Sequence, residues 1–139
     1  MLILKSETDT RKMRLAGKIA GGALMAAKDA ICPGISTLEL DKVIEDYIRS
    51  HSAIPSFKGY GGFPGSACVS VNEVVVHGIP SKKVILKEGD IVSVDVGAIY
   101  KGWYSDMART YPVGKISEDA ERLITATRES FFEGLKYCR

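Results

Sequence analysis

Cysteine is scarce in this sequence of 139 residues, and histidine is scarcer still. The three cysteines, Cys32, Cys68 and Cys138, lie far apart without any C-x-x-C pair, and there are only two histidines. This spacing excludes a disulfide framework and a zinc knuckle as the organising feature of the fold. Free thiols suit a reducing compartment, so we expect a cytoplasmic protein.

Strong net charge and long apolar runs are also lacking. The formal charge of +2 is too small to indicate a nucleic-acid partner. Charged residues, from Lys5 to Arg11, interrupt the N-terminus before any apolar run of useful length, so we predict neither a signal peptide nor a membrane partner. With no internal repeat or linker visible, residues 1–139 are expected to form a single soluble domain.

Two aspartates, Asp95 and Asp106, interrupt segments that otherwise have the composition of buried β-strands. β-Branched residues dominate Ile91 to Ile99, and aromatic residues recur from Trp103 to Tyr111. Between them, Tyr100-Lys101-Gly102 supplies a turn signal. The stretch therefore predicts a β-hairpin that carries both carboxylates.

The register of the hairpin decides whether the two carboxylates meet. A two-residue turn at Tyr100-Lys101 places Asp95 opposite Asp106, and one at Lys101-Gly102 makes them diagonal neighbours; both put them on one face. A three-residue turn without a bulge would separate them. In the two-residue registers the Cβ atoms lie roughly 5 to 8 Å apart, a span that one or two cations can bridge. The opposite face is expected to be core, formed by Val92, Val94, Val96 and Ala98.

Two like charges buried side by side cost several kcal/mol unless something compensates them. The candidates are a metal ion, an arginine such as Arg109, or a shared proton that raises one pKa. The hairpin alone leaves two interpretations open. One is a metal site, and the other is an aspartate that caps a turn or forms a salt bridge at the rim.

Helical patterns lie on both sides of this hairpin. Ser6 with Asp9, and Ser36 with Glu39, form capping boxes for two helices, and the second helix is expected to end near Ser50. The pair Gly21-Gly22 predicts close packing of the first helix against another backbone. The order helix, helix, strands, helix predicts an α+β domain with an antiparallel sheet and helices on one face.

A third helix is expected after Ser117, which caps it. It carries more apolar surface than short strands can cover, so we expect a partner or further polypeptide to cover it. The residues concerned are Phe131, Phe132, Leu135 and Tyr137.

Between the second helix and the hairpin, Pro55 to Cys68 is a loop rich in glycine and aromatic residues. On pattern alone we favour aromatic side chains that cover the protein's own core rather than a ligand. His51 is expected at the surface near a helix C-terminus. His77 ends an apolar run that we expect to be a strand; the pattern favours a structural histidine, while the following Gly78 leaves a catalytic role open.

Taken together, Gly59 to Pro80 and Gly89 to Gly114 resemble methionine aminopeptidases of the bacterial-type short form. The features that carry the resemblance are GYGGFPGSAC, the NEVVVHGIP run, and two aspartates eleven residues apart. It covers nearly the whole chain. It implies one half of a pita-bread fold, in which two related halves surround a dinuclear metal centre that removes the initiator methionine.

The resemblance also implies site residues and ligands. The position of Asp95 matches a metal ligand, that of Asp106 a ligand bridging both metals, and that of His77 a histidine contacting the substrate near the scissile bond. The implied cofactors are two divalent ions, manganese, iron or cobalt, or else zinc, and the implied substrates are N-terminal methionyl peptides. The other implied positions are Tyr60, Phe63 and Cys68 in the wall of the methionine pocket, and Asn72 at a monovalent-cation site.

The family's remaining ligands, one histidine and two glutamates, come from its second half, which this sequence does not match. Our hypothesis is therefore the N-terminal half of a methionine aminopeptidase, catalytic only when completed by a second half. One alternative is a non-catalytic module that binds a peptide or protein through Phe57 to Cys68. Another is a homodimer in which two copies bring Asp95 and Asp106 together around metals.

Overall fold

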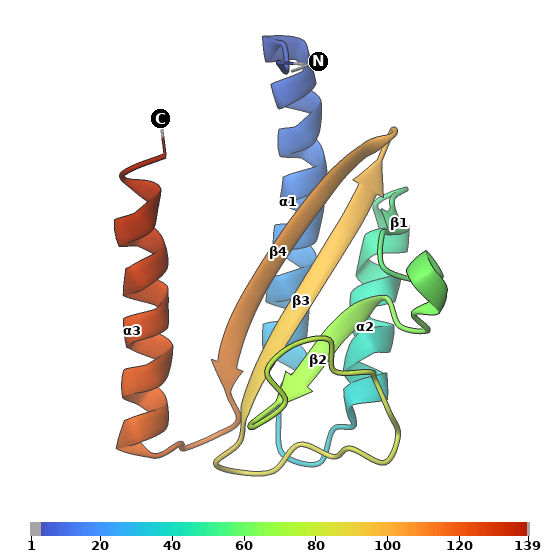
Figure 1. Cartoon of the computed structure of the whole chain (residues 1–139). Coiled ribbons are helices and arrows are strands. Elements are labelled where there is room, and N and C mark those ends of the chain that lie inside the picture. Colours follow the sequence, from blue (N-terminus) through green and yellow to red (C-terminus); the bar gives the residue numbers. More distant parts are fainter. Residues whose placement is uncertain (1–3, 139) are drawn as a thin grey trace.

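The computed structural model describes residues 4–138 and shows an antiparallel sheet backed by two helices, with a third helix to one side (Figure 1). This arrangement confirms the α+β prediction. The helices are α1 (Glu7–Ala30), α2 (Thr37–Ser50), α3 (Glu118–Leu135) and the short 3-10 turn η1 (Tyr60–Gly62). The strands are β1 (Ile54–Pro55), β2 (Ala67–Val71), β3 (Ile91–Tyr100) and β4 (Trp103–Pro112).

Strand β3 is the centre of the sheet. β4 pairs along the whole of one edge, while β1 and β2 follow one another along the other edge. The turn between β3 and β4 consists of Lys101 and Gly102, both with positive φ (50° and 80°). Two-residue turns of this kind match the twist of an antiparallel pair. The predicted hairpin is therefore confirmed, with the second of the two registers considered.

The core lies between one face of the sheet and helices α1 and α2. The alternate residues of β3 that were expected to be core are all fully buried, and Leu40, Ile44 and Ile48 of α2 meet them within the same cluster. Both capping boxes are formed, because Ser6 and Ser36 each exchange hydrogen bonds with the third residue of the following helix. The helix starts were thus correctly predicted.

Gly21 and Gly22 lie against side chains and not against another backbone, so that expectation was wrong. A Cβ on Gly21 would make an ordinary 3.7 Å contact with Met107 Sδ, whereas one on Gly22 would overlap the Tyr47 hydroxyl. The Tyr47 ring is itself stacked on His51, with centroids 4.3 Å apart. The close packing is real, but its partner is an aromatic side chain.

This difference predicts opposite effects for two adjacent alanine substitutions. Gly22→Ala must displace Tyr47 from its stack, and we expect it to lower the free energy of unfolding by about 1 to 2 kcal/mol. Gly21→Ala meets no obstacle and should raise it by up to about 1 kcal/mol, the helix propensity difference. Urea unfolding of the two variants measures both; equal effects would contradict the packing described.

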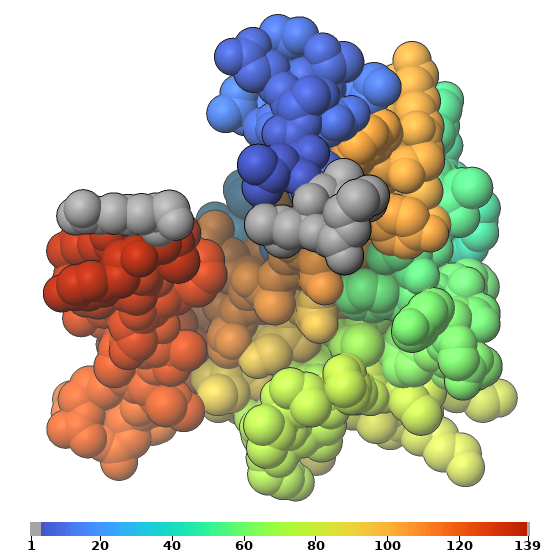
Figure 2. Space-filling view, turned by 45° about the horizontal axis from the view of Figure 1, so that its top comes forward, coloured from blue at the N-terminus to red at the C-terminus, as the bar shows by residue number. Residues whose placement is uncertain are grey.

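Helix α3 stands apart from the rest of the chain. Ser117 caps it as expected, but none of its described side chains is buried, and Phe131 is 66% exposed. Figure 2 shows α3 to one side of the sheet, separated from α1. Its apolar residues therefore have the uncovered surface that the sequence suggested.

The connection from β2 to β3 differs from the sequence-based expectation. Val74 to Val76 form no strand, and all three are exposed. β2 instead occupies residues 67–71, partly inside the stretch expected to be loop. Among the described helices, none is long and apolar enough to cross a membrane.

Candidate metal and substrate site

Asp95 and Asp106 lie on the sheet face that carries no helix. Asp95 pairs with Ala108 across the hairpin, and Asp106 pairs with Gly97. Because Asp95 and Gly97 are two residues apart on β3, the two aspartates share a face as diagonal neighbours. Their carboxyl groups are close enough for the charge of Asp106 to raise the pKa of Asp95.

The surroundings of Asp95 make ionisation of its carboxyl group unfavourable. Burial, together with the neighbouring charge of Asp106, raises the pKa of Asp95 to about 6. Its Oδ1 is buried and has no hydrogen-bond partner. An orphaned, buried oxygen beside a second carboxylate fits a divalent cation, which would supply the missing positive charge.

Arg109 does not compensate this pair. It is paired with Val94, so it belongs to the opposite face of the sheet, and the suggestion that it neutralises the aspartates was wrong. The residue directly opposite Asp95 on β2 is Cys68. Burial and the nearby aspartates raise the pKa of the Cys68 thiol to about 11, so the thiol is uncharged and lines the site as a small, largely buried side chain.

His77 is held close to the carboxylates by an unusual loop. It is not at a strand end, as the sequence suggested, but exposed in a loop with φ of 57°. The next residue, Gly78, is bound to β2, because its carbonyl accepts from Val69 N–H at 2.9 Å and its N–H donates to Ser70 Oγ at 3.0 Å. The imidazole is near enough for its positive form to lower the pKa of Asp95.

The predicted pocket residues Tyr60 and Phe63 lie in the aromatic loop, which we define as residues 57–66. Tyr60 is 83% exposed and so does not cover the protein's own core, contrary to the expectation from pattern alone. It borders a groove of about 570 Å³ that reaches Asp106. The residues lining this groove are Met13, Ser56, Phe57, Tyr60, Tyr104, Ser105 and Asp106.

Asn72 lies where β2 ends, with φ of 50°. Its amide nitrogen donates to Asp90 at 2.8 Å, and its amide oxygen accepts from Ile91 N–H at 3.0 Å. The side chain therefore holds the start of β3. His51 is exposed at the C-terminal cap of α2, and its role as a surface histidine is confirmed.

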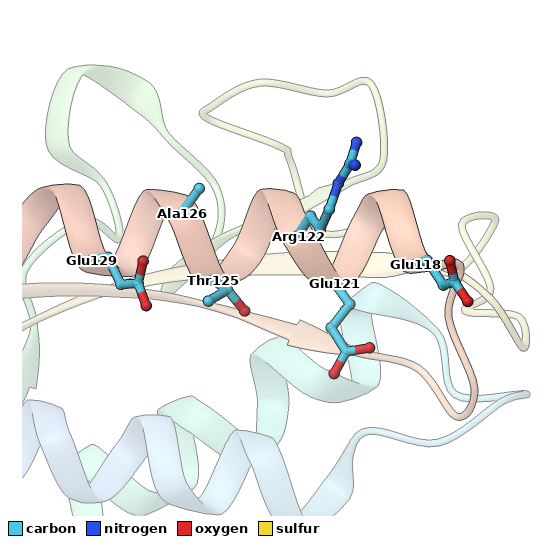
Figure 3. A pocket seen from close by; sticks show the side chains of 6 residues that line it. All are labelled: Glu118, Glu121, Arg122, Thr125, Ala126 and Glu129. Carbon is cyan, nitrogen blue, oxygen red and sulfur yellow. The ribbon is translucent and has the colours of Figure 1, made fainter.

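A second acidic hollow lies along α3, away from this site. It is lined by residues of that one helix only, namely Glu118, Glu121, Arg122, Thr125, Ala126 and Glu129. Figure 3 shows Arg122 and Glu121 pointing to different sides of the helix. These side chains do not converge on a common point, so the hollow reflects the undocked helix and gives no ligand site.

Among residues 4–138, no group of three or more histidine, cysteine, aspartate or glutamate side chains could hold a metal ion. Asp95 and Asp106 could supply two ligands to a divalent ion, and its remaining ligands would have to come from elsewhere.

Comparison with known proteins decides how to interpret this partial site. The signature of metallopeptidase family M24 matches residues 11–139. The chain belongs to metallopeptidase family M24. An M24 peptidase uses divalent metal, which agrees with the orphaned carboxylate oxygen of Asp95.

Individual M24 relatives are much longer than this chain. It is 54% identical over 136 residues to a methionine aminopeptidase of Clostridium acetobutylicum and 52% identical to methionine aminopeptidase 1 of Bacillus subtilis. Each alignment covers 98% of this chain but 54% of the relative. The chain thus spans about half the length of these relatives.

Solved structures give the same result for the fold. The methionine aminopeptidase of Thermotoga maritima superposes with a TM-score of 0.94 at 42% identity, over 99% of this chain and 55% of that one. The prolidase of Pyrococcus horikoshii superposes with a TM-score of 0.75 at 29% identity, over 86% of this chain and 33% of that one. These likenesses confirm the predicted half of a pita-bread fold.

One contributor to this M24 site was missed at the sequence level. Asp41 of α2 is 5% exposed, and its Oδ1 accepts from the backbone N–H groups of both Ser66 and Ala67 at 2.8 Å. These bonds fix the start of β2, the strand that carries Cys68 to its place opposite Asp95. The sequence did contain a signal for this role, since Asp41 lies directly beside the buried stripe formed by Leu40 and Ile44. A buried acidic side chain requires hydrogen-bond partners.

Two substitutions of Asp41 should distinguish the contribution of its hydrogen bonds to stability from the contribution of its charge. Asp41→Ala leaves two buried donors unpaired, and we expect it to lower the free energy of unfolding by about 2 to 4 kcal/mol. Asp41→Asn keeps an acceptor, and burial already raises the pKa of Asp41, so loss of the charge should cost less than about 1 kcal/mol. Chemical denaturation tests this; equal losses would contradict the role of the acceptor.

Proposed function

We propose that residues 1–139 are the N-terminal half of a methionine aminopeptidase catalytic domain and contribute half of its active site. The observation that carries the proposal is the pair Asp95 and Asp106 on one open sheet face, in a chain that is 54% identical to a methionine aminopeptidase. On this proposal the substrates are peptides and nascent proteins that begin with methionine.

In this proposal, Asp95 and Asp106 are the residues of this chain that would hold the divalent metal. Manganese, iron or cobalt, or else zinc, suits such oxygen ligands. When bound, the metal supplies Lewis-acid polarisation of the peptide carbonyl and lowers the pKa of water. His77 donates a hydrogen bond near the scissile bond and stabilises charge that develops there.

Specificity for methionine is proposed to come from the residues around the groove. Tyr60 borders the groove, Phe63 belongs to the same aromatic loop, and Cys68 lies opposite Asp95; on this proposal the three supply aromatic faces and an uncharged thiol for an unbranched thioether side chain. Asn72 is proposed to lie at a monovalent-cation site. The free thiols of the chain favour a cytoplasmic location.

An activity assay tests this proposal. The chain is combined, by fusion or by mixing, with a segment equivalent to the part of the Clostridium acetobutylicum relative that it does not match. We expect methionine release from a Met-Ala-Ser peptide with Mn²⁺ only when both parts are present. Asp95→Asn or Asp106→Asn should reduce it at least about 100-fold, since even outer-shell partners of a metal cost 10- to 100-fold. Activity of the 139-residue monomer alone, or inactivity of the completed protein with each of the four metals, would refute the proposal.

The same experiment separates the alternatives. A homodimer that rebuilds the site would show metal-dependent dimerisation by light scattering and activity without the added segment. A binding module would retain a methionyl peptide without hydrolysis, and Asp95→Ala would leave that binding unchanged.

A further inference from the structure

Three polar residues form a row on one face of α2. Thr37, Asp41 and Glu45 are spaced at i, i+4 and i+8, so their side chains project from the same side of the helix, one turn apart. Thr37 and Asp41 are buried, and the side chain of Glu45 is 14% exposed. We call these three residues the polar ladder.

Each residue of the polar ladder binds a different segment around the candidate site. Thr37 Oγ1 accepts from Ser81 N–H at 2.9 Å and donates to its carbonyl at 3.1 Å, directly after the loop that carries His77. Asp41 holds Ser66 and Ala67 at the end of the aromatic loop. Glu45 binds Lys58 Nζ at 2.6 Å, at the start of the same loop.

The aromatic loop needs such support because its own backbone is permissive. Gly59, Gly61 and Gly62 all have positive φ, and a Cβ on any of them would meet nothing within 4 Å. The loop closes mainly on itself, with Gly59 N–H donating to Phe63 O at 2.8 Å and Phe63 N–H to Tyr60 O at 2.9 Å. A self-closed loop with open space around its glycines is oriented by whatever holds its two ends.

Glu45 is suited to hold one of those ends. Its second oxygen accepts from Arg49 Nε at 2.7 Å, so both carboxylate oxygens are engaged and the side chain has a fixed position. The Lys58 and Arg49 partners lower the pKa of Glu45 to about 2. The carboxylate is therefore charged, whereas Lys58 is 42% exposed and can release it.

We propose that the polar ladder positions the walls of the substrate pocket, and that the Glu45–Lys58 ion pair is its adjustable contact, setting how far Tyr60 and Phe63 stand from Asp95. The three residues are positioning residues that act through the two loops. The statement that these walls receive methionine rests on the proposed function. The positioning of the two loops by the polar ladder does not.

The test is a double-mutant cycle read by amide hydrogen exchange, which requires no activity. We expect Lys58→Met and Glu45→Gln each to speed exchange at Gly59 and Phe63 about 2- to 5-fold, the range for a partly exposed ion pair, and the double variant to add nothing further. Lys58→Arg should restore the original rates. Amides of β3 and β4 should keep theirs, which shows that the fold is intact.

Lys42→Met is the matched control, because it removes the exposed Lys42–Asp46 pair from the same helix without touching the aromatic loop. It should leave exchange at Gly59 and Phe63 unchanged. Unchanged rates in Lys58→Met, or effects that multiply in the double variant, would overturn the positioning role. In the completed enzyme, Lys58→Met should raise KM for the methionyl peptide about 2- to 5-fold at unchanged kcat; an equal fall in kcat would contradict it.

Discussion

Asp95→Asn should make the metal-free chain more stable at pH 7 while removing its capacity to bind metal. The pKa of Asp95 is raised from 3.8 to about 6 by burial and by Asp106. A carboxyl group with a raised pKa in the folded state binds its proton more tightly there than in the unfolded chain. Its contribution to stability is therefore fully present below about pH 4 and is lost as the pH rises through about 6.

At neutral pH this shift corresponds to about 3 kcal/mol, which screening by solvent at a partly exposed site reduces to about 1 to 2 kcal/mol. We expect Asp95→Asn to raise the free energy of unfolding at pH 7 by that amount and to change it little at pH 3.5. Asp46→Asn, at an exposed ion pair on α2, is the control and should change stability by less than about 0.5 kcal/mol. Destabilisation by Asp95→Asn at both pH values would show that Asp95 has a structural role.

Gly78→Ala should cause the largest loss of stability among the glycine substitutions considered. A Cβ on Gly78 would overlap the carbonyl oxygen of Val69 and lie 2.7 Å from its carbon and 2.8 Å from Ser70 Cα. These are backbone atoms in the middle of β2, so no rotamer change can relieve the overlap. We expect a loss of about 2 to 4 kcal/mol, the range for overpacking and backbone strain.

The same substitution should move His77 away from the carboxylates. Both the N–H and the carbonyl group of Gly78 are hydrogen-bonded to β2. An added methyl group must therefore displace the loop that carries the imidazole of His77. Moving the imidazole away removes its lowering influence on the pKa of Asp95, so that pKa should rise further, which carboxyl chemical shifts during a pH titration would report. Gly21→Ala is the control; an unchanged Asp95 titration in Gly78→Ala would contradict the proximity of His77.

The elements specified by local signals were predictable. Ser6, Ser36 and Ser117 each begin a helix because a side-chain oxygen satisfies free N–H groups within three residues. The alternation of Val92, Val94 and Val96 specifies a face of β3 in the same local way. The position of Asp95 and Asp106 on one face followed from this alternation and from the two-residue turn.

Features that depend on distant partners were not predictable. Val74 to Val76 have strand propensity but form no strand. The residue that hydrogen-bonds to β2 is Gly78, whose carbonyl accepts from Val69 N–H, and not one of these valines. Asp41 was missed because its partners, Ser66 and Ala67, lie 25 and 26 residues away. The uncovered apolar surface of α3 was expected from its composition, but the position of the helix to one side of the sheet was not, since its capped, amphipathic sequence is that of an ordinary packed helix.

We propose that Asp95 and Asp106 together hold a divalent cation on the open face of the sheet. Titration of the ¹⁵N-labelled chain with Mn²⁺ tests it most directly, because paramagnetic broadening maps even weak sites. We expect the broadening to be centred on the amides of Asp95, Gly97, Asp106 and Ala108 and to disappear in the Asp95→Asn, Asp106→Asn double variant. Broadening confined to the glutamates of α3, or unchanged in the double variant, would contradict it.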